Sequence, residues 1–459
     1  SEREKKYFLL LLILGLFSQT SFAVEPLIKV GEAKSKKSNL AFPGLNNIGS
    51  NKSSTALKIA ADIYNTAKGD LEISTYFNLL NPASFLENTT NLSAKPKNID
   101  ATNGFKFLTW KTLDAEFLIR ATYLITDNEM TVESFLYNVA QEKLVVGKRY
   151  KGNLKQAVQI GHTFANDILE TLTGRKGFYL SKFIATTDKT GYKEVVTMNW
   201  DGSNLDTLTS DRSVAISPNW SPDGKSVIYS IYTKKVGSAQ QNLTMFIHDI
   251  VKGKRSILSN RNGLNSGGSF SPDGNYVYLT ISKSGTPNIY KINLKGQEVA
   301  QLTNGPSGAM NVEVAVSPDG TKLAFSSDRG GSPMIYTMNS DGTNVQRKTF
   351  QGKYNSTPTW SHDGKKIAFA GQIENYFDIF TMDADGGNIV RITTALKANG
   401  QRASNEDPSF SPDGRYIVYT SNRTGKNQIY LNNLDGSNEH RVTNDSYNYF
   451  KPKWSNNIE

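Results

Sequence analysis

Residues that could do chemistry recur along this chain instead of gathering in one place. The pattern Ser-x-Asp-Gly occurs five times, at residues 221–224, 271–274, 317–320, 361–364 and 411–414. Carboxylates repeated in this way could form calcium loops or a charged ring. A simpler interpretation is that each aspartate fixes its own turn by accepting hydrogen bonds from nearby backbone N–H groups. Because the motif returns almost unchanged, we favour the structural interpretation.

Other searches for a reactive site find little. The chain has no cysteine, which excludes disulfides, thiolate metal sites and cysteine nucleophiles. Its four histidines are too far apart in sequence for a local metal motif, and we interpret His162 and His362 as structural. The sequence has neither a Gly-x-Ser-x-Gly nucleophile elbow nor a phosphate-binding glycine loop. We expect no catalytic residue, no cofactor and no metal, with a weakly bound channel ion left open.

The elements that would position the repeated turns are short strands. From serine to serine, the five turns and a truncated sixth at Trp454-Ser455 lie 50, 46, 44, 50 and 44 residues apart. A period in the forties, with Asp-Gly hairpin turns inside each repeat, is typical of four-stranded propeller blades. Residues 178–210 supply three strands, and the chain end supplies the missing inner strand. The sequence therefore predicts six blades, one of them composite, with the aromatic residue before each turn packed between blades.

The part of the chain before the repeats has a different character. Arg3, Lys5 and Lys6 precede a short apolar run, and Ser21-Phe22-Ala23 fits a cleavage site, so residues 1–23 are predicted to be a secretory signal peptide. Residues 24–50 are interpreted as an extended partner-binding arm. Helical and strand patterns mix over residues 51–174, including a helix that Gly69 should end. The predicted fold class is multidomain: a small N-terminal α/β domain followed by an all-β six-bladed β-propeller over residues 178–459.

The residues that differ between repeats are the candidates for binding. Unlike residues stand just before each inner strand, where the chain should reach the rim of the central channel, although ordinary solvated loops are the alternative. The candidates are Gly267, Glu313, Thr357, Asp407 and Lys451. The net charge of +10 is scattered, without a basic stripe between aromatics, so we expect no nucleic-acid binding.

Several stretches resemble one known family. They are the helix end Asn-Asp-Ile-Leu-Glu-Thr-Leu-Thr-Gly, the segment Ala-Glu-Phe-Leu-Ile and two blade phrases, at residues 166–174, 115–119, 326–336 and 406–414. Together with the domain order, they make the chain similar to the TolB family, the periplasmic component of the Tol-Pal system of Gram-negative bacteria. The resemblance implies a non-catalytic periplasmic adaptor that supports outer-membrane integrity and envelope constriction in cell division.

The resemblance also implies partners. The lipoprotein Pal would dock at the propeller rim, on the five candidates named above. The C-terminal domain of TolA would bind the arm, where an added strand could form from Val24, Glu25, Pro26, Leu27, Ile28, Lys29 and Val30. The lysines at 34, 36 and 37 depart from the usual family opening. Other outer-membrane proteins are further candidate partners, contact with membranes would come through partners only, and a monomer is expected.

An enzyme is the alternative class. Propellers with Ser-Pro-Asp-Gly turns also accompany serine hydrolases, but these need an α/β-hydrolase domain, for which the sequence after Trp454 leaves no room. A propeller hydrolase or a glycan-processing enzyme therefore remains the second hypothesis.

Overall fold

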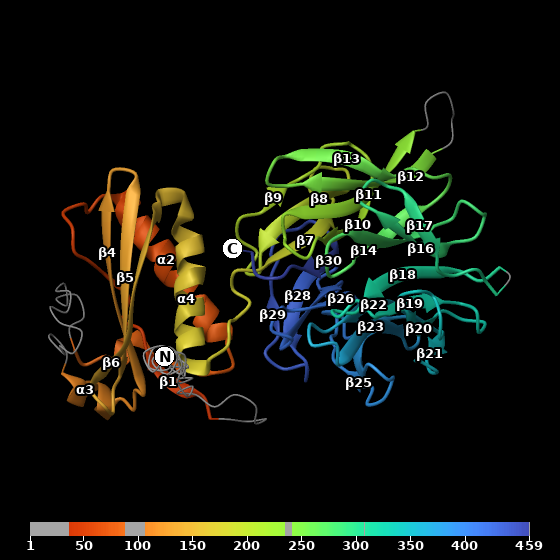
Figure 1. Cartoon of the computed structure of the whole chain (residues 1–459). Coiled ribbons are helices and arrows are strands. Elements are labelled where there is room, and N and C mark those ends of the chain that lie inside the picture. The colour runs from red at the N-terminus through yellow and green to blue at the C-terminus, as the bar shows by residue number, and fades with distance from the viewer. Residues whose placement is uncertain (1–35, 88–105, 235–240, 307, 459) are drawn as a thin grey trace, which may run out of the picture. The chain divides into compact units, whose positions relative to one another are not determined.

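The computed structural model describes residues 36–87, 106–234, 241–306 and 308–458 (Figure 1). The predicted signal peptide and arm residues 24–30 lie outside this range. The described residues form two compact units, which are treated separately below. The first contains residues 36–57, 74–87, 106–151 and 167–176, and the second contains residues 58–73, 152–166, 177–234, 241–306 and 308–458.

A mixed six-stranded sheet dominates the first unit, in the order β3-β1-β4-β5-β6 with β2 also paired to β4. Its strands are β1 (Ser38–Ala41), β2 (Leu45–Asn47), β3 (Phe77–Leu79), β4 (Phe117–Thr126), β5 (Glu129–Asn138) and β6 (Lys143–Asn153). Strands β4 and β5 form a hairpin, because they pair antiparallel up to Thr126 opposite Glu129. Parallel pairing places β1 between β3 and β4, and Leu40 and Ala41 are fully buried. The last part of the segment interpreted as an arm therefore belongs to the sheet.

The two longest of the described helices are α2 (Ser54–Ile73) and α4 (Ala157–Thr173). Short helical turns complete the set: η1 (Pro82–Ser84), α3 (Phe107–Thr112) and η3 (Leu154–Gln156). The expected stop at Gly69 is wrong: α2 continues to Ile73 because Leu71 and Ile73 are buried, which outweighs the modest helix penalty of one glycine. Helix α4 ends directly before Gly174, which adopts a φ of 72°.

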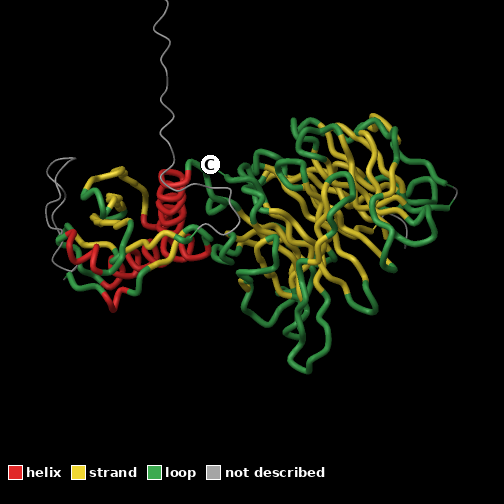
Figure 2. The backbone as a smooth tube through the Cα atoms, turned by 90° about the horizontal axis from the view of Figure 1, so that it is seen from below, coloured by secondary structure: helices red, strands yellow, loops and turns green. Residues whose placement is uncertain are grey.

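Six four-stranded sheets form the propeller, which contains strands and loops only (Figure 2). Blades 1 to 3 are β10 (Ala215–Trp220), β11 (Ser226–Lys234), β12 (Gln241–Asp249), β13 (Lys254–Ser259); β14 (Asn265–Phe270), β15 (Tyr276–Ile281), β16 (Asn288–Asn293), β17 (Glu298–Gln301); and β18 (Asn311–Val316), β19 (Lys322–Ser327), β20 (Met334–Asn339), β21 (Gln346–Arg347). Blades 4 and 5 are β22 (Tyr354–Trp360), β23 (Lys366–Gln372), β24 (Phe377–Asp383), β25 (Val390–Arg391); and β26 (Asn405–Phe410), β27 (Tyr416–Ser421), β28 (Gln428–Asn433), β29 (His440–Arg441).

The sixth blade is composite, as predicted. Its strand order is β30-β7-β8-β9, which joins β30 (Tyr449–Trp454) to β7 (Lys182–Thr187), β8 (Glu194–Asn199) and β9 (Asp206–Thr207). Trp454 lies opposite Phe183 in the ladder, and its indole Nε1 donates a 2.6 Å hydrogen bond to Ser181 Oγ. This pairing of distant segments closes the ring and removes two raw sheet edges.

The repeated aspartates hold their turns, as the structural interpretation predicted. Ser221 Oγ donates to Asp223 Oδ1 at 2.6 Å, and the same oxygen accepts from the Lys225 N–H at 3.0 Å. These bonds lower the pKa of Asp223, because they favour its charged form. The same serine–aspartate bond recurs in the other four turns. Gly224 takes a φ of 68°, which a residue with a side chain rarely adopts.

An aromatic residue precedes five of the six turns and is buried between neighbouring blades, as predicted, whereas Val316 precedes the turn at residues 317–320. Exposed fractions range from 2 % to 8 % for Trp220, Phe270, Trp360, Phe410 and Trp454. Two of the indoles also bond to the next blade: Trp220 Nε1 donates to Lys453 O and Trp360 Nε1 to Ala315 O, both at 3.1 Å. The core of the propeller therefore consists of layers between blades, which fix the inner strands around the centre.

Candidate functional site

Each inner strand of the propeller contains the same irregularity. The ladder to the second strand shifts register after its second or third residue in all six blades. At each shift one residue adopts a left-handed conformation with φ between 50° and 64°; these residues are Ser217, Gly267, Glu313, Thr357, Asp407 and Lys451. Five of the six carry a side chain, although this conformation favours glycine. A bulge of this kind re-aims a side chain out of the regular ladder.

Proline follows the left-handed residue in four of these six strands, at positions 218, 358, 408 and 452. Proline has no N–H and is excluded from regular central ladders, but a bulge leaves a position without a ladder partner. The local sequence thus supports the bulge in most blades.

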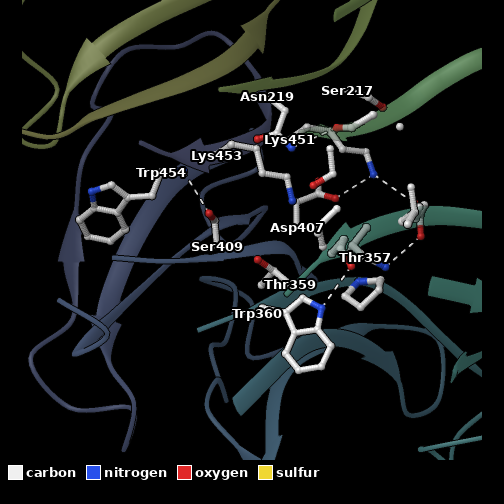
Figure 3. Close-up of a pocket in the computed structure, with 18 of the residues that line it drawn as sticks. Ser217, Asn219, Thr357, Thr359, Trp360, Asp407, Ser409, Lys451, Lys453 and Trp454 are labelled. Atoms are coloured by element: carbon white, nitrogen blue, oxygen red, sulfur yellow. Dashed lines mark hydrogen bonds and ion pairs between the residues drawn. The ribbon is translucent and has the colours of Figure 1, made fainter. Parts of the chain in front are cut away.

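The six left-handed residues, which we call the bulge ring, line one recess of about 180 Å³ (Figure 3). A second layer comes from the residues two positions further along each strand, including Asn219, Ser269, Thr359, Ser409 and Lys453. The five rim candidates from the sequence are therefore brought together. They lie within the inner strands, at the bulges, and not just before the strands as the sequence indicated. Ser217 was missed, because Ala215 stands two positions before it where four of the other ring residues have asparagine. Its spacing could have identified it, since all six ring residues lie four positions before the turn serine.

An ion-paired network connects three blades across this recess. The Lys451 Nζ lies 2.9 Å from Asp407 Oδ1 and 3.5 Å from Glu313 Oε1 (Figure 3). The other Glu313 carboxylate oxygen accepts a 2.8 Å hydrogen bond from the Thr357 N–H. Burial acts to lower the pKa of Lys451, but the carboxylates of Asp407 and Glu313 outweigh burial and raise that pKa. Lys451 is therefore firmly charged and ties blades 3, 5 and 6 together.

Two ionisable side chains near this network, Glu406 and Lys453, have pKa values that are shifted from their ordinary values toward pH 7. Removal of water around Glu406, with repulsion from Asp407 and Glu313, raises its pKa to about 7, even though the residue keeps solvent exposure. For Lys453, burial lowers the pKa and repulsion from Lys451 adds to that effect. Glu406, beside the recess, therefore takes up a proton at a higher pH than an ordinary glutamate does.

The recess offers binding groups but no reactive constellation. Hydroxyls, an amide, two carboxylates and two amines face it, which suits hydrogen bonds and ion pairs with a polar partner. His362 also lines it, and burial lowers its pKa. In the part of the chain that the structure covers, no group of three or more His, Cys, Asp or Glu residues is arranged to hold a metal ion.

Two further predictions from the sequence can be placed or set aside. His162 is buried, and its Nδ1 lies 2.7 Å from Asp70 Oδ2, which agrees with a structural role. The predicted TolA-binding residues 24–30 lie outside the described range, so their role stays a prediction.

A closed six-bladed ring with a polar, ion-paired recess at its centre defines a propeller of the binding class, joined to an α/β unit. Two family models match the chain. The TolB amino-terminal domain matches residues 26–145, and the TolB beta propeller domain matches residues 169–400 and 377–459. The chain belongs to the TolB family, whose members are non-catalytic proteins of the cell envelope.

Individual relatives agree with this assignment. The chain is similar to the Tol-Pal system protein TolB of Desulfosudis oleivorans, with 30 % identity over 302 residues and 65 % of each chain covered. The TolB of Syntrophotalea carbinolica is 34 % identical over 170 residues, which cover 37 % of this chain and 38 % of that relative. These alignments span less than two thirds of either relative. The crystal structure of TolB from Acinetobacter baumannii shares the fold, with a TM-score of 0.72 at 24 % identity over 93 % of this chain and 98 % of the other.

The predicted fold class is confirmed by these matches and by the observed architecture. Among the described helices, none combines the length and apolar character that crossing a bilayer would require.

Proposed function

We propose that this protein is a periplasmic adaptor of the Tol-Pal system, which binds the lipoprotein Pal at the propeller opening and the C-terminal domain of TolA through its N-terminal arm. The observation that carries the Pal contact is the bulge ring. One structurally equivalent position in six blades presents serine, glycine, glutamate, threonine, aspartate and lysine to a single recess. Architecture alone would not require such variety, whereas recognition of one asymmetric partner would.

The polar chemistry of the recess supports a protein partner. Charged groups that are already paired, as Lys451 is with Asp407 and Glu313, are held in position before binding, so less ordering is needed on association. A partner segment with its own hydrogen-bond donors and acceptors could share this network. The family name of the curated relatives, Tol-Pal system protein, supports Pal as that partner.

Binding of TolA rests on the resemblance of the arm and on its position in the chain. Residues 24–30 precede β1, which already pairs in parallel on both sides, and an extended segment can add to a partner's sheet. In this proposal the adaptor acts in the periplasm, maintains outer-membrane integrity and supports envelope constriction during division.

Charge reversal in the bulge ring tests the Pal contact. The variant Glu313→Lys with Asp407→Lys should retain cognate Pal at least about tenfold less well than the parent in a pull-down of the mature protein, because each carboxylate contacts Lys451. The matched control is Asp127→Lys with Glu129→Lys, at the exposed turn between β4 and β5, which should retain Pal normally. Unchanged retention in a folded Glu313/Asp407 variant would refute the ring assignment.

A further inference from the structure

In blade 3, an arginine of the blade itself packs over a pair of stacked aromatic rings, and we call a residue held in this way a seated arginine. Phe325 and Tyr336 stack with centroids 6.0 Å apart, and the Arg329 guanidinium carbon lies 5.4 Å and 5.1 Å from the two rings. Arg329 Nη2 donates to Asn311 Oδ1 at 2.6 Å, and its Nε donates to Ser327 Oγ at 3.1 Å. The cation is thus held by a ring face and two oxygen acceptors.

Blade 5 repeats the arrangement with different aromatics. Tyr419 and Tyr430 stack at 6.3 Å, and the Arg423 guanidinium carbon lies 4.0 Å from the Tyr430 ring. Arg423 Nε donates to Ser421 Oγ at 2.9 Å, and its Nη2 lies 3.5 Å from Asn405 Oδ1. In both blades the asparagine is the first residue of the inner strand and pairs with the serine in the ladder. The arginine follows that serine by two positions.

Blade 4 has the asparagine and the aromatic pair but not the arginine. Phe369 and Phe380 stack at 5.6 Å with an interplanar angle of 15°. Asn355 pairs with Gly371 where the other blades have serine, and Ile373 stands where they have arginine. A cavity of about 730 Å³ opens at this place, lined by these five residues among others.

The oxygen that would accept the missing guanidinium is present and unused. Asn355 is 3 % exposed, and its Nδ2 donates to Gln351 O at 2.9 Å and contacts Met334 Sδ at 3.1 Å. No described residue donates to Asn355 Oδ1. That oxygen lies 2.9 Å from the place where a Cβ on Gly371 would be, and Phe380 lies 3.0 Å from the same point, so it faces the wall of the cavity. An acceptor that lines the cavity without a donor from the protein is free to bind the N–H of a ligand.

We propose that the blade 4 cavity binds the guanidinium of an arginine side chain supplied by a partner protein. The guanidinium would stack on the Phe369–Phe380 pair and donate to Asn355 Oδ1, as Arg329 and Arg423 do within their own blades. The cavity is much larger than a guanidinium, and its mouth carries the exposed apolar residues Phe350 and Ile389, at 70 % and 50 % exposure. A protein segment that presents arginine beside apolar groups fits this surface better than a free amino acid.

Cations that already line the cavity do not exclude this ligand. Arg391 is paired with the carboxylate of Asp378, and its Nε donates to Thr393 O at 3.1 Å. Outer-strand arginines occupy the same place beside the seated arginines: Arg347 Nε donates to Thr349 O and Arg441 Nε to Thr443 O, both at 2.7 Å. A seated guanidinium and an outer-strand arginine therefore coexist in blades 3 and 5. An anion held by Arg347 and Lys348 is the competing occupant.

The test is a titration of the mature full-length protein with argininamide, lysinamide and sulfate, followed by NMR. We expect argininamide to bind with a dissociation constant on the order of millimolar and several-fold more tightly than lysinamide, because only the guanidinium is planar. Sulfate binding without argininamide binding would establish the anion instead. No binding of argininamide would also overturn the proposal.

A variant at position 373 supplies the specific test. Ile373→Arg should seat an arginine within the blade, abolish argininamide binding and raise Tm. The matched control Ile257→Arg, at an exposed position on β13 of blade 1, should leave binding within about twofold of the parent. Phe380→Leu should lose several-fold in argininamide affinity and the preference over lysinamide. Undiminished argininamide binding in folded Ile373→Arg, or in folded Phe380→Leu should the first variant not fold, would refute the site.

Discussion

Replacement of Lys451 by methionine tests the network at the centre of the propeller. The change keeps the length of the side chain and removes the ammonium that lies 2.9 Å from Asp407 and 3.5 Å from Glu313. Asp407 is only 9 % exposed, so its carboxylate would remain largely out of water without a counter-charge. Loss of one partner of a fully buried pair costs about 3–5 kcal/mol, and exposed pairs contribute about 0–1 kcal/mol. Because a third of the Lys451 side chain is exposed, we expect a loss of about 1–2 kcal/mol at pH 7.

The sign of the pH dependence follows from the pKa of Lys451. The folded state raises this pKa above the ordinary value of 10.5, so the stabilisation is fully present below that pH and is lost only in strongly alkaline solution. The destabilisation of Lys451→Met should therefore be present in full at neutral pH and should fade only in strongly alkaline solution.

Lys453→Met is the matched control, two residues along the same strand. Burial and the repulsion of Lys451 lower the pKa of Lys453, so its charge is disfavoured in the folded state. Its replacement should cost less than that of Lys451 or even stabilise the fold. Urea denaturation of both variants at pH 7 and pH 4 gives the free energies of unfolding. Equal stability of Lys451→Met and the parent, or a larger loss for Lys453→Met, would refute the reasoning.

Three further predictions concern titration, turns and closure. The folded state raises the pKa of Glu406 from 4.5 to about 7, so its contribution should make the free energy of unfolding fall as pH rises through that interval. In urea titrations, Glu406→Gln should flatten this dependence on pH. An unchanged slope in the variant would contradict the raised pKa. Asp223→Ala should lower the free energy of unfolding by about 0.5–1 kcal/mol at pH 7 in denaturant titrations, because two hydrogen bonds of a mostly exposed turn are lost. This loss of stability should fade as pH drops through the lowered pKa of Asp223. A loss that does not depend on pH would argue against the role of the Asp223 carboxylate. Deletion of residues 451–459 removes most of β30 and should lower and broaden the calorimetric melting transition of the propeller, whereas an unaltered transition would be incompatible with the composite blade.

The blades could be predicted because their signals are local. A serine and an aspartate two positions later form each turn, and the repeat of this short motif gives both the blade period and the composite closure. Five ring residues were predicted because they differ between repeats, and their fixed distance from the turn serine would also have identified Ser217. The bulge that aims them was not predicted, because no single residue type marks it: Gly267 and Lys451 adopt the same left-handed conformation.

Other contacts between segments that lie far apart in the sequence could not be predicted and were seen only in the structure. The contact of Lys451 with Glu313 links residues 138 positions apart and depends on which blades face each other across the recess. The position of β1 inside the sheet depends on two parallel partners, of which β3 is short and carries weak strand signals. The missing arginine of blade 4 is visible in the sequence at Ile373, but its meaning depends on the seated Arg329 and Arg423.

The most direct measurement of the proposed Pal contact is the affinity of cognate Pal for the variant Ser217→Trp, by isothermal titration calorimetry. Ser217 is the ring member that was not predicted, and an indole there would fill much of the 180 Å³ recess while the residues of the Lys451 ion pairs stay unchanged. The control, Val299→Trp, alters an exposed position on β17, the outermost strand of blade 2. We predict at least about tenfold weaker binding for Ser217→Trp and parental binding for Val299→Trp. Equal affinity of folded Ser217→Trp and the parent would show that the partner does not enter the recess.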